Sequence, residues 1–201
     1  MVAGEGRAPG PRRRAGPEAH GRHGGSSVEN NKAEGIVDTY VSLLVEAGVR
    51  TATIDAVAKA CGLSKAGLLH YFRSRSELDD ALVARLRTLL TEDLRLMRAA
   101  EGGPVRYYLT SSLDTEAPLE RAVVAASRLA QAGNAEARAA LAEAHAAWLD
   151  VLEDFLGNPV LARLALLAGD GASHHADLAE PGEEAFLSAQ DIEHFARIIE
   201  R

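Results

Sequence analysis

The stretch from Thr53 to Phe72 constrains the fold more than any other part of this 201-residue chain. Ala58 and Gly62 lie four residues apart, a spacing that suits two short helices crossing at a steep angle. A small side chain at position 58 lets the helices approach closely, and a glycine at position 62 tolerates the left-handed turn between them. The sequence therefore predicts a helical hairpin with helices over about residues 54–61 and 65–72.

Polar and apolar positions in this hairpin separate an inner from an outer surface. The inner positions are apolar and are expected to fill the wedge between the helices and the core beside it: Val57, Cys61, Leu63, Leu68, Tyr71 and Phe72. Removing these positions leaves an outer face on the second helix: Ser64, Lys65, Ala66, Gly67, Leu69 and His70. A recognition helix presents such a face to the major groove of DNA.

The outer side chains suit contacts with a nucleic acid. Lys65 can serve a phosphate or a guanine edge, His70 can serve a phosphate or a base, and Ala66 can touch a thymine methyl group. Thr53 and Ser64 stand at predicted helix N-termini, where hydroxyl and backbone N–H groups suit phosphate oxygens. An ordinary structural hairpin is the alternative, but the apolar wedge and the Tyr-Phe pair that follows it favour DNA binding.

These residues resemble the N-terminal signature of the tetracycline-repressor (TetR) family over about residues 30–80. The matching positions are Ala47-Gly48, Thr53, Val57-Ala58, Gly62-Leu63-Ser64-Lys65, Leu68, His70-Tyr71-Phe72 and Ser74-Arg75. The resemblance implies a homodimer whose DNA-reading helices lie one turn of duplex apart. It also implies a variable C-terminal domain, whose last two helices pair across the dimer and whose interior binds a small-molecule inducer.

Two positions depart from the family pattern. Gly67 stands where the family often has threonine, and Leu69 stands where it usually has a tyrosine that contacts phosphate. Leu69 cannot donate that hydrogen bond, which weakens binding by about 1 kcal/mol. With Arg75 placed for a further phosphate, the positions expected to contact DNA are Thr53, Ser64, Lys65, Ala66, Gly67, Leu69, His70, Tyr71 and Arg75.

The hydrophobic pattern is helical almost throughout, so the expected fold class is all-α. It comprises an N-terminal three-helix helix-turn-helix DNA-binding domain over residues 29–76 and a larger helical ligand-binding and dimerisation domain over residues 77–201. Residues 1–28 are rich in Gly, Pro and Arg and are predicted to be a disordered basic tail. The tail is either solvated without a specific role or an arm that contacts phosphates or the minor groove.

Charge is divided unequally along the chain. Residues 1–100 carry a net charge of +3 and residues 101–201 a net charge of −10, within a total of −7. A polyanion-facing front half with a repelled back half explains this division, and ordinary variation of the surface is the alternative.

Capping residues divide the helical part of the chain. Gly48 is expected to end a first helix whose apolar face carries Ile36, Tyr40 and Leu44. The run Ser74-Arg75-Ser76-Glu77 matches the capping box that opens a long fourth helix. Further stops and starts are expected at Pro104, Pro118, Gly133-Asn134 and Gly157-Asn158-Pro159.

The C-terminal end of the chain is expected to hold two apolar helices. The first follows Pro159 and is loosened by Gly169, Gly171 and the pair His174-His175. The second begins at about Glu183 and places five side chains on its apolar side: Phe186, Leu187, Phe195, Ile198 and Ile199. These helices fit a dimer interface, although their faces can equally be buried within one subunit.

Tyr107, Tyr108, His145 and Trp148 are candidates for lining a ligand pocket in the C-terminal domain, with a simple aromatic core as the alternative. The apolar character of that domain favours a hydrophobic or amphipathic ligand. No metal site is expected at His174-His175, because no Cys or carboxylate accompanies them at ligand spacing. Cys61 is expected to be a small core residue rather than a redox sensor.

The sequence thus predicts a sequence-specific DNA-binding transcriptional regulator, acting as a ligand-responsive repressor that releases its operator when a small hydrophobic molecule binds. A constitutive DNA-binding dimer without a ligand, either repressor or activator, is the alternative. An enzyme is disfavoured, because no nucleophile–base pair, phosphate loop or carboxylate pair occurs at convincing spacing. A cytoplasmic protein without a cofactor or membrane segment is expected.

Overall fold

The computed structural model describes residues 25–179 and 187–201, and these form nine α-helices and no strand. The helices are α1 (Gly25–Ala47), α2 (Ile54–Ala60), α3 (Lys65–Tyr71), α4 (Arg75–Ala99), α5 (Pro104–Ser111), α6 (Pro118–Gln131), α7 (Ala135–Leu156), α8 (Pro159–Leu178) and α9 (Ala189–Ile199). The expected all-α fold is confirmed. Residues 1–24 of the predicted tail lie outside the described residues, and its last four residues, 25–28, belong to α1 rather than to a disordered segment.

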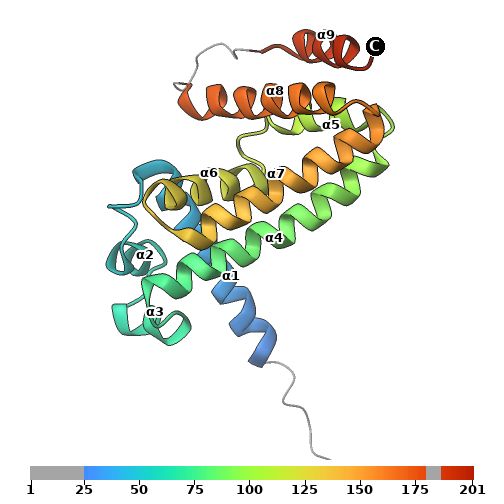
Figure 1. Ribbon diagram of the computed structural model, residues 1–201. Helices are drawn as coiled ribbons and strands as arrows, with labels where there is room; N and C mark the ends of the chain where they lie inside the picture. The colour runs from blue at the N-terminus through green and yellow to red at the C-terminus, as the bar shows by residue number, and fades with distance from the viewer. Residues whose placement is uncertain (1–24, 180–186) are drawn as a thin grey trace, which may run out of the picture.

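The predicted hairpin is present at one end of the molecule, where α2 and α3 lie beside α1 (Figure 1). Gly62 joins them with a φ of 66°, in the left-handed region expected for that position. Val57 and Leu68 are fully buried between the helices. Each such side chain stabilises the fold by about 1.5–3 kcal/mol through burial alone.

Helix α4 leaves the hairpin and runs the length of the molecule beside α7 (Figure 1). Ser74 opens it by accepting a hydrogen bond from the backbone N–H of Glu77. The capping box is incomplete, because the Glu77 carboxylate accepts from the N–H of Arg73 rather than from that of Ser74. The complete box occurs instead at Ser188 and Asp191, where α9 begins.

The last two helices differ from expectation in detail. Helix α8 continues without a break through Gly169 and Gly171 to Leu178, so these glycines do not loosen it. Helix α9 begins at Ala189, after a non-helical Leu187 and Ser188, rather than at about Glu183. Glu183 and Phe186 lie outside the described residues.

The apolar core falls into two clusters that do not respect the expected boundary at residue 76. The first cluster joins α1–α3 to the inner faces of α6 and α7, through residues such as Tyr40, Leu68, Ala125 and Leu129. The second lies farther from α3 and contains Tyr108, Trp148 and the buried residues of α8 and α9. Helix α6 is therefore part of the core on which the hairpin rests.

Helices α8 and α9 cover the end of the molecule opposite to α3 (Figure 1). Both carry large apolar side chains on their outer surfaces: Val160, Leu164, Leu167, Leu178, Phe195 and Ile198. No described helix is long and apolar enough to cross a membrane.

Candidate nucleic-acid interface and C-terminal pockets

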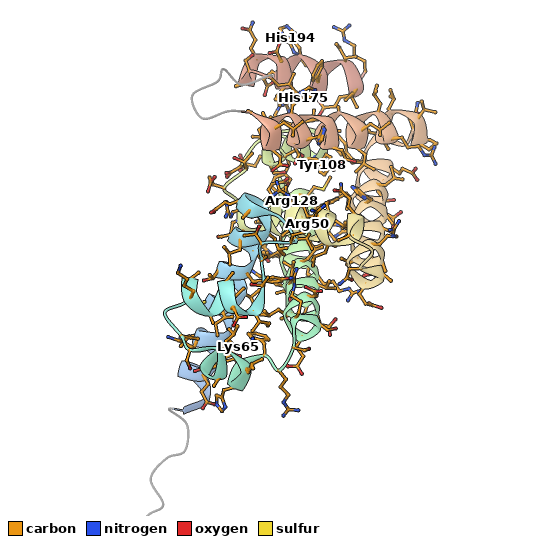
Figure 2. All side chains as sticks on the ribbon, turned by 90° about the vertical axis from the view of Figure 1, so that its left-hand side faces the viewer. Arg50, Lys65, Tyr108, Arg128, His175 and His194 are labelled. Carbon is orange, nitrogen blue, oxygen red and sulfur yellow. The ribbon has the colours of Figure 1, made fainter. Side chains whose placement is uncertain are left out.

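The outer face of α3 is exposed as the sequence predicted. Ser64, Lys65, Ala66 and His70 are open to solvent, whereas Gly67 and Leu69 are half-buried. Figure 2 places Lys65 near one end of the molecule and His194 of α9 at the other. The polar groups on this face come from one short helix, whose orientation is fixed by the buried Leu68.

Thr53 and Ser64 act as N-caps. The Thr53 hydroxyl oxygen accepts from the N–H of Ala56 at 3.2 Å, and the Ser64 hydroxyl oxygen accepts from the N–H of Gly67 at 3.0 Å. Each oxygen is the acceptor in its cap, so the hydroxyl hydrogen can still donate to a phosphate. Capping thus orients both hydroxyl groups at the helix starts, where anions are favoured.

Lys65 is held by Asp55 of α2, with 3.0 Å between the ammonium nitrogen and a carboxylate oxygen. The side chains of Lys65 and Asp55 are 59% and 67% exposed, respectively. An exposed ion pair of this kind stabilises the fold by only about 0–1 kcal/mol. A DNA phosphate can therefore replace Asp55 as the partner of the Lys65 ammonium group. Asp55 places a negative charge beside the face expected to meet DNA.

Arg75 does not point outward as expected. Its guanidinium donates to the hydroxyl oxygen of Tyr40, to a carboxylate oxygen of Asp79 at 3.2 Å and to the carbonyl of Val49 at 3.4 Å. It also lies 5.0 Å from the centre of the Tyr40 ring. The reason is the tertiary packing: the start of α4 lies beside the end of α1, so acceptors from α1 (Tyr40), from the turn after it (Val49) and from α4 itself (Asp79) all come within reach. Arg75 joins these two helices instead of presenting a free charge.

Tyr71 belongs both to the apolar core and to the edge of the outer face of α3. Its side chain is half-buried against the first core cluster, and its ring meets the exposed His70 ring edge-on, with 5.4 Å between the centroids. The Tyr71 position is therefore both part of the support of α3 and adjacent to the outer face.

The four aromatic candidates of the C-terminal domain do not line one pocket. Tyr108 and Trp148 are buried, with their rings 5.6 Å apart. The Tyr108 hydroxyl donates to Asp170 at 2.8 Å. Tyr107 and Trp148 both donate to Asp93, at 2.9 and 2.8 Å. Burial raises the pKa values of both tyrosines, and these hydrogen bonds keep their polar ends satisfied. Tyr108 and Trp148 are core residues, and Tyr107 borders a separate shallow depression beside Gly103.

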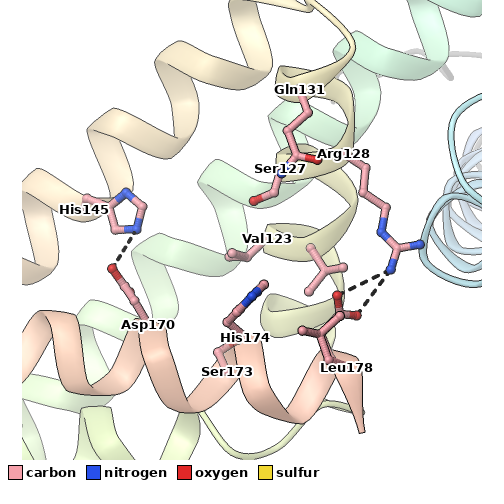
Figure 3. Close-up of a pocket in the computed structure, with 11 residues that line it drawn as sticks. Val123, Ser127, Arg128, Gln131, His145, Asp170, Ser173, His174 and Leu178 are labelled. Atoms are coloured by element: carbon pink, nitrogen blue, oxygen red, sulfur yellow. Dashed lines mark hydrogen bonds and ion pairs between the residues drawn. The ribbon is translucent and has the colours of Figure 1, made fainter. Parts of the chain in front are cut away.

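The expected C-terminal pocket instead lies between α6, α7 and α8 and has a volume of about 450 Å³ (Figure 3). His145 is the one aromatic candidate at its wall, 3.4 Å from Asp170. That hydrogen bond raises the pKa of His145. The wall also includes Arg128, Gln131, Ser127, Ser173, His174 and Asp177. Val123, Val124 and Leu178 complete the lining, so the pocket combines the expected apolar surface with several polar and charged side chains.

A second pocket, of about 600 Å³, lies on the other side of the same contact between α6 and α8. Ser173 and Asp177 border both pockets. Glu120 lines the second pocket and accepts a hydrogen bond from the Ser173 hydroxyl at 2.8 Å. Burial raises the pKa of Glu120 to about 7.

Sequence reasoning missed Arg128, Glu120, Asp170 and Asp177. Each is a charged residue on a helix that also carries buried apolar residues, α6 or α8, and charged residues are seldom buried without a partner. That pattern was the signal available in the sequence. In the described parts of the chain, no group of three or more His, Cys, Asp or Glu side chains is placed to hold a metal ion. Cys61 is half-buried against the first core cluster.

Two family models match the chain, and together they span both domains. The model of bacterial regulatory proteins of the tetR family matches residues 36–82, and a tetracyclin repressor-like C-terminal domain model matches residues 102–190. With the helix-turn-helix geometry described above, these matches show that the chain belongs to the TetR family of DNA-binding transcriptional regulators. It is thus a regulator rather than an enzyme.

Solved structures share this fold. The ketosteroid transcriptional regulator KstR2 of Mycobacterium tuberculosis aligns with a TM-score of 0.59 at 18% identity, covering 85% of this chain and 93% of that one. A candidate transcriptional regulator of Streptomyces coelicolor A3(2) aligns with a TM-score of 0.57 at 20% identity, covering 85% and 99%. A candidate TetR-family regulator of Rhodococcus sp. gives 0.56 at 16% identity, covering 84% and 97%. Comparison with curated proteins found no match.

Proposed function

We propose that this protein is a homodimeric repressor that reads its operator through α3 and releases it when a small molecule occupies the C-terminal domain. The observation that carries the proposal is the shared core. Helix α6 packs in the same cluster as the hairpin, and its opposite side forms one wall of the pocket between α6, α7 and α8. A change at that wall can therefore act on the support of α3.

The proposed DNA contacts follow from exposure and from the caps. Lys65 neutralises a phosphate or reads a guanine edge, and the hydroxyl groups of Thr53 and Ser64 donate to phosphates. His70 and the half-buried Tyr71 extend the same face, while Ala66, Gly67 and Leu69 permit close approach and apolar contact. Arg75 is assigned a supporting role, because its donors are committed to Tyr40, Asp79 and Val49.

The proposed dimer forms through α8 and α9. Their outer apolar side chains form an exposed surface at the end opposite to α3, and family members dimerise. A two-fold axis that runs along the direction from α9 to α3 would direct both α3 helices to the same side of the dimer. A palindromic operator with half-sites one helical turn apart matches that symmetry.

The mixed lining of the pocket favours an amphipathic effector, which combines an apolar part with hydrogen-bonding groups. Valine and leucine side chains supply apolar surface, and serine, glutamine, histidine, arginine and aspartate side chains supply polar groups, whereas Tyr108 and Trp148 lie in the core. An effector that binds more tightly to the arrangement unsuited to DNA shifts the population towards it.

The well-packed aromatic pair Tyr108–Trp148 favours the second candidate, a constitutive DNA-binding dimer without an effector.

Selection of genomic fragments tests the proposal. The purified protein is mixed with fragmented DNA of its source at moderate salt, and the retained fragments are sequenced. We expect a short inverted repeat that is recovered by wild type and recovered poorly by Lys65→Ala. A direct repeat, or no enrichment over unselected DNA, would contradict the homodimeric reading of an operator.

Small molecules that stabilise the protein against heat are then tested for release of the selected operator. Operator release by a stabilising compound supports the repressor with an effector. Tight binding of such a compound in the α6–α8 pocket without a change in operator affinity would refute the coupling, and would leave the constitutive dimer.

A further inference from the structure

Arg128 of α6 joins three helices through one guanidinium group. One nitrogen donates to the backbone carbonyls of Leu44, at 2.9 Å, and Val45, both in the last turn of α1. The other terminal nitrogen lies 3.3 and 3.4 Å from the two carboxylate oxygens of Asp177 on α8. Figure 3 shows the Arg128 side chain reaching from α6 towards α1.

The C-terminal end of α1 is stabilised by a hydrogen-bond donor that carries a positive charge. The last carbonyls of an α-helix lack partners within the helix, and the helix dipole favours a positive charge at that end. Gly48 closes the helix by donating its N–H to Leu44, and Arg128 brings a permanent cation to the same turn. The Arg128 side chain is only 29% exposed, so little water competes for these donors.

The same side chain forms part of the pocket wall. Arg128 and Asp177 both line the pocket between α6, α7 and α8, and Asp177 also lines the second pocket. A group in either pocket that attracts one member of the pair therefore acts directly on the cap of α1. Because α1 carries Tyr40 and Leu44 into the core beneath α2 and α3, the cap supports the DNA-reading surface.

We propose that Arg128 is a positioning residue for DNA binding: it sets the end of α1 while Asp177 of α8, in direct contact with it, holds it in place. Loss of the pair frees the end of α1 and the loop towards α2, so the reading helix is presented less uniformly. The link to an effector rests on the proposed function above, whereas the structural link from Arg128 to α1 does not.

A second arginine keeps α6 and α1 together when Arg128 is replaced. Arg121, about two turns closer to the start of α6, donates to the hydroxyl of Ser42 at 3.0 Å and lies 3.5 Å from Glu46. The Arg128→Gln variant is therefore expected to fold. Arg138 offers a matched control, because its guanidinium donates to the carbonyl of Ala130 within the C-terminal domain, 3.1 Å away.

Hydrogen exchange of the full-length protein without DNA tests the structural link. Arg128→Gln is expected to speed exchange of the amides in residues 44–53 on the order of tenfold, the loss of one charge-assisted hydrogen bond. Exchange in α7 should not change. Asp177→Asn should give a smaller increase in the same segment, and Arg138→Gln should give none. Unchanged exchange in Arg128→Gln, or an equal increase in Arg138→Gln, would overturn the proposal.

Operator affinity and the spacing of the reading helices test the link to function. Both measurements use a Cys61→Ala background that carries Lys59→Cys. Position 59 of α2 is exposed, and a spin label attached there reports the distance between the two hairpins of the dimer. Arg128→Gln should weaken operator binding about tenfold and broaden the distance distribution between the two labels, while thermal stability changes little. Arg128→Lys should weaken binding and broaden the distances less than Arg128→Gln does. An ammonium group keeps the positive charge but lacks the two separate nitrogens that donate to α1 and to Asp177.

The two proposals can fail separately. If genomic selection finds no operator, the exchange experiment still decides the role of Arg128. Faster exchange in Arg128→Gln with unaltered operator affinity and unaltered label distances would overturn its positioning role in DNA binding. If every variant binds the operator with wild-type affinity, the positioning role of Arg128 is likewise overturned. The proposed repressor function is then unaffected.

Discussion

Replacing Gly169 with alanine is expected to destabilise the protein, although alanine is the better helix former. Gly169 lies buried inside α8, and a Cβ atom there would stand 2.4 and 2.8 Å from two ring carbons of Tyr108. It would also stand 3.0 Å from the hydroxyl oxygen of Ser112. Tyr108 is only 5% exposed and is packed against Trp148, so its ring has no open space to enter.

The magnitude follows from opposing terms. Alanine in a helix interior gains about 1 kcal/mol over glycine. Overpacking a filled core costs about 1–3 kcal/mol. A displaced Tyr108 also loses its 2.8 Å hydrogen bond to Asp170, which contributes about 1 kcal/mol. We expect a net loss of about 1–3 kcal/mol in the free energy of unfolding.

Urea unfolding followed by far-ultraviolet circular dichroism, at one fixed protomer concentration, measures this loss. Trp148 is the single tryptophan of the chain, and its fluorescence reports the disturbance of the neighbouring Tyr108 ring. Gly35→Ala is the matched control, because Gly35 lies exposed within α1 and a Cβ there meets nothing within 4 Å. That control should gain about 0.5–1 kcal/mol. A Gly169→Ala protein as stable as the control would refute the packing argument.

Three further outcomes are expected. Lys65→Ala should weaken operator binding and reduce the salt dependence by about one phosphate contact, whereas Asp55→Asn should strengthen binding by removing a negative charge from the same face; an unchanged salt slope would exclude Lys65 as a phosphate contact. Because burial raises the pKa of Glu120 to about 7, the folded protein loses stability as the pH rises from about 4.5 through 7 and this carboxyl ionises. Glu120→Gln stays neutral and keeps an acceptor for Ser173, so unfolding curves from pH 5 to 8 should show it gaining on wild type by at most about 3 kcal/mol, and a constant difference would contradict this. Removing residues 1–24, which carry five arginines, should lower operator affinity at low salt if they form a basic arm, and equal affinity would identify a solvated tail.

Local chemistry explains why the helices and the reading face were predictable. Gly48 and Gly157 adopt positive φ angles at helix ends, and Asn134 and Asn158 cap the next helices with their side chains. Each of these features depends on residues within a few positions of one another. The inner and outer faces of α3 follow from helical periodicity in the same way.

The candidate pocket was harder to predict. Aromatic residues at helical spacing suit a core and a ligand site equally, and only the packing of α5 against α7 and α8 buries Tyr108 and Trp148. The pocket wall forms where α6, α7 and α8 meet, so the residues that line it are scattered from Val123 to Leu178. The start of α9 was misplaced because its Ser188 capping box was not recognised.

The sequence by itself therefore determined the all-α fold, most helix ends and the exposed face of α3, because caps, turns and periodicity act over a few residues. Only the tertiary structure determined the partners of the buried charged residues and the packing around the glycine of α8. Arg75 reaches Tyr40, 35 residues away, and Arg128 reaches Leu44, 84 residues away. Gly169 is required by a tyrosine ring on another helix. Such partners are set by how the helices pack, and no local pattern in the sequence encodes that arrangement.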